Sequence, residues 1–464
     1  MLKQYRFHTR IAPCASIRPS LLKNVGFMIR YRMIVRSPFP NRFFLTILLL
    51  FVLSVPGCAN VRGFLNESLP IPLTTADEIE RSDFVVAKDD DVIGRLAMIR
   101  VDKEDTLPDI ARHFSLGINT VSAANPGVDI WVPEAGERVL LPLSFILPDT
   151  HRKGVVINLA TMRIFSFKNN GNLLEVSTYP IGVGTPERPT PMGKMYITRK
   201  KHRPTWYVPA SIAADHRKKG DPLPSQVPPG PENPLGEHAL YLSRPTYLIH
   251  GTNKPASVGL RATNGCIRLY PEDVERLFEN TSVKTPVKIV NQPYLAGQRD
   301  GIVYLEAHTP FEESGTANWK KIYAKLKKIE KTSGNALDWE KVKDVVTEAR
   351  GYPVPISTNR QGLEMGRAEP VKIWHPSTLN GKPEVPEFQT DAWYVLAATL
   401  RDKVDARRLA AIINHQGPPI PARVLAKGDR YRVLAGPFDD KRAAKDAAKR
   451  LKIYLELDGV LFET

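Results

Sequence analysis

A cysteine and a histidine sixteen residues apart could together perform nucleophilic catalysis. His250 ends an apolar run, and Cys266 lies in the segment TNGCIRL, residues 263–269. A thiolate attacks a carbonyl carbon, and an imidazole within hydrogen-bond distance can take the thiol proton or hold the anion as an ion pair. Gly265 leaves room for a substrate beside the sulfur, and the backbone amides around the cysteine can stabilise an oxyanion. The pattern therefore predicts a thiol nucleophile, Cys266, with His250 as its base.

The cysteine count indicates that Cys266 is a free thiol. Of the three cysteines, Cys14 and Cys58 belong to the N-terminal targeting region, so the folded part keeps one thiol without a disulfide partner. A free cysteine is most often a buried apolar side chain, but the surrounding motif favours the catalytic interpretation. No metal site and no cofactor are expected. Three histidines, His202, His216 and His238, have no ligand-like spacing to His250 or Cys266.

Residues 1–57 are predicted to form a signal or targeting segment. Nine Lys or Arg and no acidic residue precede a run of thirteen mostly apolar residues at 43–55. This length suits the core of a signal peptide and is short for a membrane span. The run ends in VPGC at 55–58, which resembles the lipobox of bacterial lipoproteins and implies lipidation of Cys58. A plain signal peptide or an uncleaved anchor is the alternative, and a start at Met33 would give a signal of ordinary proportions.

The basic charge of the chain does not predict nucleic-acid binding. The formal net charge is +16, and the nine charges before residue 43 leave +7 on the remainder. No helix-turn-helix, zinc-finger or RNA-binding signature accompanies this modest excess. Solvated surface faces explain it more simply.

The length allows about two to four domains, and the expected fold class is multidomain α+β. Six prolines between residues 352 and 390, in a stretch with little apolar periodicity, read as a linker. The expected units are a signal segment at 1–57, a tether at 58–98, a βααβ unit at 99–150, a β-rich unit at 151–310, a helical and Pro-rich linker at 311–390, and a βαββαβ unit at 391–464.

The unit at 99–150 carries helical periodicity between two strand-like segments. Apolar residues recur at 107, 110, 111 and 114 behind two cap candidates, Asp105 and Thr106, and a second helix near 119–124 stops at Asn125-Pro126-Gly127. A strand is expected at 138–141. This pattern resembles a LysM domain, which implies binding to N-acetylglucosamine-containing glycans. Glu104 replaces a glycine common before the Asp-Thr pair, and a structural spacer without sugar binding is the alternative.

Residues 151–310 alternate short apolar strands with turn residues, which predicts a β-rich domain. One helix is expected after the cysteine, with Pro271 in its first turn and Glu272 and Asp273 near its positive end. The proline-rich stretch at 221–234 is interpreted as a long ordered loop or lid.

Five segments resemble the L,D-transpeptidases with a YkuD-type catalytic domain, in particular the ErfK/YbiS-like periplasmic branch with a LysM-like module. They are TPMG at 190–193, NPLG at 233–236, HGTN at 250–253, GLR at 259–261 and TNGCIRL at 263–269. The resemblance implies that the cysteine attacks the carbonyl of meso-diaminopimelate in a peptidoglycan tetrapeptide stem. D-alanine would leave, and an amine would resolve the thioester.

Carried over by position, the resemblance makes Cys266 the nucleophile and His250 the base. The backbone carbonyl of Gly251 would orient the imidazole, and Arg268 would bind a stem-peptide carboxylate. The oxyanion pocket would be shaped by Thr263, Asn264 and Gly265. The family often has His at position 264, and since Asn cannot act as a base at neutral pH, His250 is the sole candidate base.

The C-terminal unit is predicted to fold as β-α-β-β-α-β, which indicates a ferredoxin-like sheet with two helices on one face. The segment YRVLAGPF at 431–438 and the alanine-rich helix after it resemble the SPOR domain, which implies binding to peptidoglycan strands stripped of stem peptides at division sites. The first strand departs from the family at Leu396, Ala398 and Leu400, and a generic packing module is the alternative.

These observations predict a periplasmic L,D-transpeptidase of a Gram-negative bacterium, tethered by lipid at Cys58 and enriched at the septum. Glycan strands and stem peptides are the expected partners, with the membrane through the lipid anchor and no nucleic acid. The acceptor could be a diaminopimelate amine, giving 3-3 cross-links, a lysine of an outer-membrane lipoprotein, or water. The alternative is a noncatalytic peptidoglycan-binding lipoprotein with a relic site.

Overall fold

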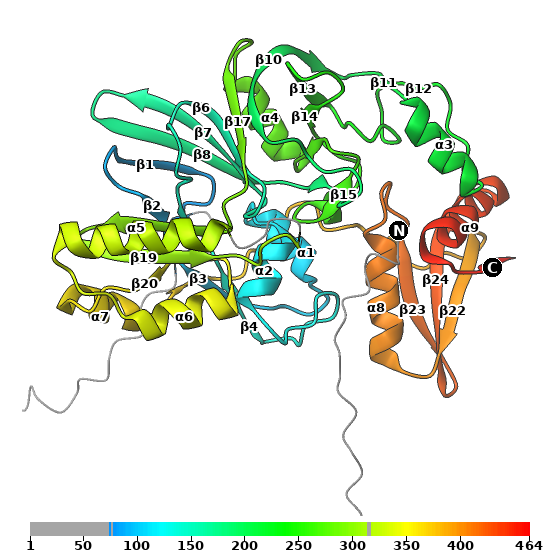
Figure 1. Cartoon of the computed structure of the whole chain (residues 1–464). Helices are drawn as coiled ribbons and strands as arrows, with labels where there is room; N and C mark the ends of the chain where they lie inside the picture. Colours follow the sequence, from blue (N-terminus) through cyan, green and yellow to red (C-terminus); the bar gives the residue numbers. More distant parts are fainter. Residues whose placement is uncertain (1–73, 76–77, 313–316) are drawn as a thin grey trace, which may run out of the picture. The chain divides into compact units, whose positions relative to one another are not determined.

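The computed structural model describes residues 74–75, 78–312 and 317–464 (Figure 1). The predicted signal segment and the lipidation site Cys58 lie outside these described residues. Among the described helices, none combines the length and the apolar character that crossing a membrane requires.

A nine-stranded mixed sheet carries the predicted site. Its order is β1-β8-β7-β6-β17-β10-β13-β14-β16. Most of its strands are antiparallel to their neighbours, but β17 pairs parallel with β6 and β16 pairs parallel with β14. The β-rich unit predicted from the sequence is confirmed. Its strands are β1 (Asp83–Ala87), β6 (Gly154–Asn158), β7 (Arg163–Asn170), β8 (Leu173–Pro180), β10 (Gly193–His202), β13 (His238–Leu242), β14 (Leu248–His250), β16 (Ile267–Arg268) and β17 (Pro286–Val290).

One helix follows the cysteine, as predicted. Helix α4 (Pro271–Glu279) begins with proline, carries Glu272 and Asp273 in its first turn, and buries Val274 and Leu277 in the core beneath the sheet. The acidic first turn suits the positive end of the helix, and the apolar face explains its place against the strands. Helix α4 therefore supports the sheet immediately after the strand that carries Arg268.

Shorter elements surround this sheet. β9 (Val183–Gly184) pairs with β15 (Arg261–Thr263), and β11 (Trp206–Tyr207) pairs with β12 (Gln226–Val227). Helix α3 (Ala210–Lys218) lies between β11 and β12 in the chain and has no buried residue. The proline-rich stretch expected as an ordered loop thus includes β12.

The order β-α-α-β predicted for the unit at 99–150 is observed. β3 (Ala97–Arg100) pairs antiparallel with β4 (Arg138–Leu141), and α1 (Leu107–His113) and α2 (Ile118–Ala124) lie between them in the chain. Thr106 caps α1 by accepting a hydrogen bond from the Asp109 amide at 3.2 Å. Asn125 ends α2 by bonding to Val121 and to both backbone groups of Leu140. The predicted helical face is wholly buried at Leu107, Ile110, Ala111 and Phe114.

The tether expected at 58–98 is wrong for its described part. β1 is the edge strand of the large sheet, and β2 (Val92–Gly94) pairs with β5 (Ser144–Ile146). Phe84, Val92 and Ile93 are buried. These apolar residues hold the segment in two sheets, so the extended tether cannot include residues 83–98.

The segment expected as a helical and Pro-rich linker at 311–390 contains helices, as predicted, but they are packed against a sheet rather than forming an open connection. Helices α5 (Ala317–Ser333) and α6 (Trp339–Glu348) lie beside β19 (Ile302–Ala307) and β20 (Val354–Pro355) in Figure 1. These strands form a three-stranded sheet with β18 (Tyr294–Arg299), and the two helices share a core with this sheet. Ile322, Leu326 and Val342 are buried there because both helices are amphipathic. Residues 294–307, assigned to the catalytic unit from sequence, belong to this sheet instead.

The Pro-rich half of the expected linker packs on the βααβ unit. After α7 (Arg360–Arg367), β21 (Val371–Lys372) pairs parallel with β3, and Ile373 and Leu379 join the same core as Leu107. This stretch shows little apolar periodicity because it is held by the backbone pairing of β21 with β3 and by a few side chains that enter the core. It is not an open connection.

The C-terminal unit has the predicted βαββαβ order, with a sheet of order β23-β24-β22-β25. Asp402 and Asp440 cap its two helices by accepting amide hydrogen bonds from residues three positions further on. Its elements are β22 (Trp393–Leu400), α8 (Lys403–Asn414), β23 (Ala422–Lys427), β24 (Arg430–Phe438), α9 (Lys441–Leu455) and β25 (Val460–Glu463).

Candidate active site

Strand register brings the predicted base and nucleophile together. In the parallel pair of β14 and β16, Ile249 lies opposite Ile267 and His250 opposite Arg268. Cys266 directly precedes β16. Paired residues of neighbouring strands point to the same side of a sheet, and so do residues two apart along one strand. The side chains of His250, Arg268 and Cys266 therefore lie on one face. The segment between His250 and Cys266 is thus a crossover between adjacent strands.

The imidazole of His250 is oriented by its own backbone. Its Nδ1 lies 2.7 Å from the Gly251 carbonyl oxygen, which can only accept, so Nδ1 carries the proton and Nε2 keeps its lone pair. Burial, followed by the nearby charge of Arg268, lowers the pKa of His250 to about 3, against the opposing effect of the Gly251 and Leu235 carbonyls. His250 is therefore neutral at physiological pH and can accept a proton.

Cys266 is a protonated thiol at neutral pH. Its side chain is half-buried, and Sγ donates to the Thr246 carbonyl oxygen at 3.5 Å. Burial raises the pKa of the thiol, although a backbone hydrogen bond from Leu248 and the charge of Arg268 act in the opposite direction. The resting site thus contains a neutral thiol and a neutral imidazole rather than an ion pair.

The turn before the cysteine is closely packed. Thr263 Oγ1 donates to the Cys266 carbonyl at 2.7 Å and accepts from the Gly265 amide at 3.1 Å. Gly265 has a φ of +102°, and a Cβ there would lie 2.8 Å from the Tyr247 ring. Gly265 therefore does not leave the open room for a substrate that the sequence predicted; the Tyr247 ring fills the space beside it, and glycine is needed for the turn itself.

Arg268 lies beside the pair, half-buried. Its Nη1 donates to Ser257 Oγ at 2.7 Å, and its charge lowers the pKa of both His250 and Cys266. One cation thus disfavours the imidazolium and favours the thiolate, so it makes His250 a weaker base and Cys266 a better nucleophile.

Asn264 is exposed two residues before Cys266 and bonds to Arg188, which sequence reasoning missed. Its Oδ1 accepts from Arg188 Nη1 at 2.6 Å, and Arg188 Nη2 makes an ion pair with Asp215 of α3. Arg188 lies two residues before the TPMG segment, but no local pattern links it to a turn 76 residues away.

Two of the quoted segments build the loops around the pair. Thr190 Oγ1 accepts from the Gly184 amide at 2.9 Å. Asn233 is fully buried, donates to the Pro204 carbonyl at 2.8 Å and accepts from the Leu235 amide at 2.9 Å. Since the Leu235 carbonyl acts on His250, Asn233 supports the base indirectly.

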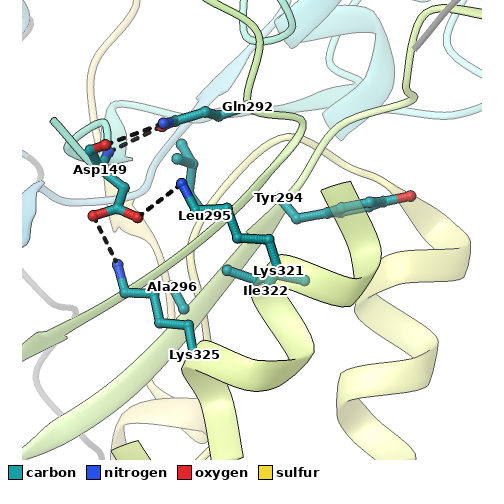
Figure 2. A pocket seen from close by; sticks show the side chains of 8 residues that line it. All are labelled: Asp149, Gln292, Tyr294, Leu295, Ala296, Lys321, Ile322 and Lys325. Atoms are coloured by element: carbon teal, nitrogen blue, oxygen red, sulfur yellow. Dashed lines mark hydrogen bonds and ion pairs between the residues drawn. The ribbon is translucent and has the colours of Figure 1, made fainter. Parts of the chain in front are cut away.

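A pocket elsewhere does not involve these residues. Figure 2 shows Asp149 beside Lys321 and Lys325 of α5, at 3.4 and 3.9 Å, with the strand residues of β18 behind them. Gln292 bonds to both backbone groups of Asp149. Within the described residues, no group of three or more His, Cys, Asp or Glu is placed to hold a metal ion.

Comparison with known proteins finds two family matches. Residues 152–289 match the L,D-transpeptidase catalytic domain, and residues 389–461 match the SPOR domain. The chain is 36% identical over 280 residues to a protein of Salmonella typhimurium named probable L,D-transpeptidase ErfK/SrfK, covering 59% of this chain and 90% of that protein. It is 40% identical over 223 residues to probable L,D-transpeptidase YbiS of Escherichia coli, covering 47% and 72%.

A solved structure is also similar, but only weakly. The catalytic domain of the L,D-transpeptidase from E. faecium shares 20% identity over 31% of this chain and 99% of that chain, with a TM-score of 0.23. A likeness of this size supports no further conclusion.

Proposed function

Because this chain belongs to the L,D-transpeptidase family, we propose that Cys266 takes an acyl group from a peptidoglycan tetrapeptide stem and passes it to an amine. The observation that carries this proposal is the placement of His250 at the end of β14 and of Cys266 immediately before the adjacent β16, with the tautomer of His250 set by the Gly251 carbonyl. A neutral imidazole is the form that a general base requires.

The first half of the reaction forms a thioester. As Cys266 Sγ attacks the diaminopimelate carbonyl carbon, the thiol proton moves to Nε2 of His250. The tetrahedral intermediate collapses with cleavage of the C–N bond, and the imidazolium returns the proton to the amine of D-alanine, which leaves. Arg268 stabilises the sulfur charge and is the residue that we assign to a stem-peptide carboxylate.

The second half restores the enzyme. An acceptor amine attacks the thioester carbon and loses a proton to His250, the C–S bond breaks, and Cys266 regains its thiol. The Gly265 amide is already bonded to Thr263, so we assign the oxyanion to the Cys266 amide and the Asn264 side chain. Thr263 and Gly265 act by shaping the turn.

The other modules would place the reaction on the wall. We assign glycan binding to the SPOR domain and membrane attachment to a lipid on Cys58, and two such attachments raise the local enzyme concentration. The LysM-like unit is less suited to glycan binding. Its Asp105 carboxylate is buried and paired with His375 and Lys382, at 2.8 and 3.0 Å. The spacer alternative for this unit gains support from these contacts.

Purified enzyme incubated with tetrapeptide muropeptides tests the proposal, with product masses as the readout and Cys266→Ala as the control. Cross-linked dimers would identify a diaminopimelate amine as acceptor. A conjugate to an added lysine-ended lipoprotein peptide would indicate wall anchoring, and tripeptides would indicate hydrolysis. If the wild type yields none of these products, the chain is a noncatalytic binding protein.

A further inference from the structure

We propose that Arg188 is a positioning residue that holds Asn264 with its side-chain N–H groups toward the substrate and connects this arrangement to helix α3. The inference rests on the proposed transpeptidase function and deepens it by one residue. It concerns how the acyl donor is held beside Cys266.

The chemistry of the two side chains sets the orientation of Asn264. A guanidinium group has five N–H donors and no acceptor. Arg188 Nη1 lies 2.6 Å from the Asn264 side chain, so the atom facing it must be the amide oxygen. The amide nitrogen then faces away from Arg188, on an exposed residue two positions before the nucleophile. Without Arg188 the amide could rotate and present either atom.

Arg188 belongs to a loop that packs against the catalytic turn. Its amide bonds to the Thr185 carbonyl at 3.1 Å and to Thr185 Oγ1 at 3.2 Å. A Cβ on Gly265 would lie 3.3 Å from the Pro189 carbonyl oxygen and 3.6 Å from that of Arg188. The backbone of this loop is thus in contact with the turn that carries Cys266. This contact fixes the backbone position from which the Arg188 side chain extends.

The second arm of Arg188 reaches α3. Nη2 pairs with Asp215 Oδ2, and the two side chains are 35% and 41% exposed. Since α3 has no buried residue, its position depends on such polar contacts rather than on a core. The ion pair of Arg188 with Asp215 therefore couples the position of α3 to the orientation of Asn264. A substrate that displaced α3 would also change the orientation of the Asn264 side-chain amide beside Cys266.

A double-mutant cycle on the full-length enzyme tests this role. The variants are Arg188→Gln, Asn264→Ala and the double variant, and the readouts are kcat and KM with tetrapeptide muropeptides and the melting temperature. Arg188→Gln is expected to lower kcat/KM roughly 10-fold, the scale of losing one hydrogen bond to a charged group, without lowering the melting temperature. In the Asn264→Ala background the same change should cost less than about 2-fold.

Two further variants separate geometry from charge. Arg188→Lys keeps the charge but lacks the fork that reaches two partners, so it should not restore wild-type kcat/KM. Arg217→Gln removes a neighbouring exposed charge from α3 and should leave the kinetics unchanged. The rate at which iodoacetamide alkylates Cys266 should be the same in all variants, because this small reagent does not need Asn264.

The failures of the two proposals are distinguishable. A wild type that forms no product contradicts the transpeptidase proposal itself. An active wild type in which Arg188→Gln has no effect, or has its full effect even without Asn264, overturns the positioning role alone. A full effect of Arg188→Gln in the Asn264→Ala background would mean that Arg188 contacts the substrate directly.

Discussion

In the proposed mechanism, the charge state of His250 determines which step the site must assist. Many reactive cysteines are stored as thiolates beside a cation or at a helix N-terminus. Here burial raises the pKa of Cys266 and, together with Arg268, lowers that of His250. Under the proposed mechanism, the thiol therefore loses its proton during attack, and His250 must be in place at that moment.

The first prediction concerns the pH dependence of thiol reactivity. The rate of Cys266 alkylation by iodoacetamide should still be rising beyond about pH 8.5, the ordinary pKa of a thiol, with no step between about pH 5 and 8. Peptide mapping of the modified cysteine measures the rate. A plateau above about pH 6 would instead indicate a resting thiolate–imidazolium pair.

The second prediction separates the base from its neighbour. His250→Ala should lower turnover of muropeptides by roughly 100-fold or more, the usual contribution of a general base. Asn264→Ala should have a smaller effect, because it removes one donor and leaves proton transfer intact. If the Asn264 change were the more damaging, oxyanion stabilisation rather than His250 would supply most of the rate.

The third prediction uses a mechanism-based label. A carbapenem should acylate Cys266, because its strained lactam presents an activated carbonyl to the thiol. Intact-protein mass spectrometry should find one adduct on the wild type. Its persistence in Cys266→Ala would refute the assignment of the nucleophile.

At the scale of elements, helix α4 joins the catalytic sheet to the βααβ unit. Asp273 accepts from Ser115 Oγ at 3.1 and 3.0 Å, and the buried Arg163 donates to the Ser115 carbonyl at 3.0 Å. Glu272 pairs with Arg112 at 2.9 Å. These polar contacts between the two parts imply that the βααβ unit supports the helix behind the active site.

The fourth prediction follows from the buried carboxyl of this helix. Burial, and next the charge of Glu272, raise the pKa of Asp273 to about 7. In the unfolded chain the pKa is about 3.9, so the native state holds the extra proton between these values. The contribution of Asp273 to the free energy of unfolding is full below about pH 4 and is lost as pH rises through about 7.

Asp273→Asn removes this titration, so the melting temperature of the wild type relative to the variant should fall between about pH 4 and 7 and stay level above that range. Thermal unfolding across this range measures the difference. Glu279→Gln, an exposed acid at the end of the same helix, is the control and should produce no such trend. A constant difference for Asp273→Asn would mean that the buried carboxyl is ionised throughout.

At the scale of the whole molecule, segments far apart in sequence complete each other. β21 extends the small sheet of β3 and β4 across more than 270 residues, and Leu379 shares a core with Leu107. The region between the catalytic domain and the SPOR domain is therefore part of the folded body. Any truncation for biochemistry should keep residues up to about 390 to preserve these contacts.

The fifth prediction concerns placement in the cell. A fluorescent fusion of the full chain should be enriched at the division site, and one with residues 391–464 deleted should not be, because the SPOR domain is the module that we assign to bare glycan strands. The truncated enzyme should still act on soluble muropeptides. Unchanged enrichment would point to the lipid or the LysM-like unit, and lost activity would show that catalysis needs the C-terminal unit.

Sequence patterns alone were enough to predict the family, the SPOR domain and the order of most strands and helices. These properties depend on residues close together in the chain, such as the TNGCIRL turn, the capped helix at 107–113 and the alternating strands of 151–290. Local sterics and periodicity act over a few residues, so a single segment contains the information.

The contacts of Arg188, the pKa shifts of His250 and Cys266, and the packing of residues 83–98 and 311–390 could not be predicted from sequence patterns. Each of these depends on two surfaces that meet after folding. Neither the loop at 188 nor the turn at 264 shows in its own pattern that the other will be its partner. Likewise, the pKa of His250 depends on burial by strands that are distant in sequence. Residues 371–372 form a strand because they pair with the free edge of β3.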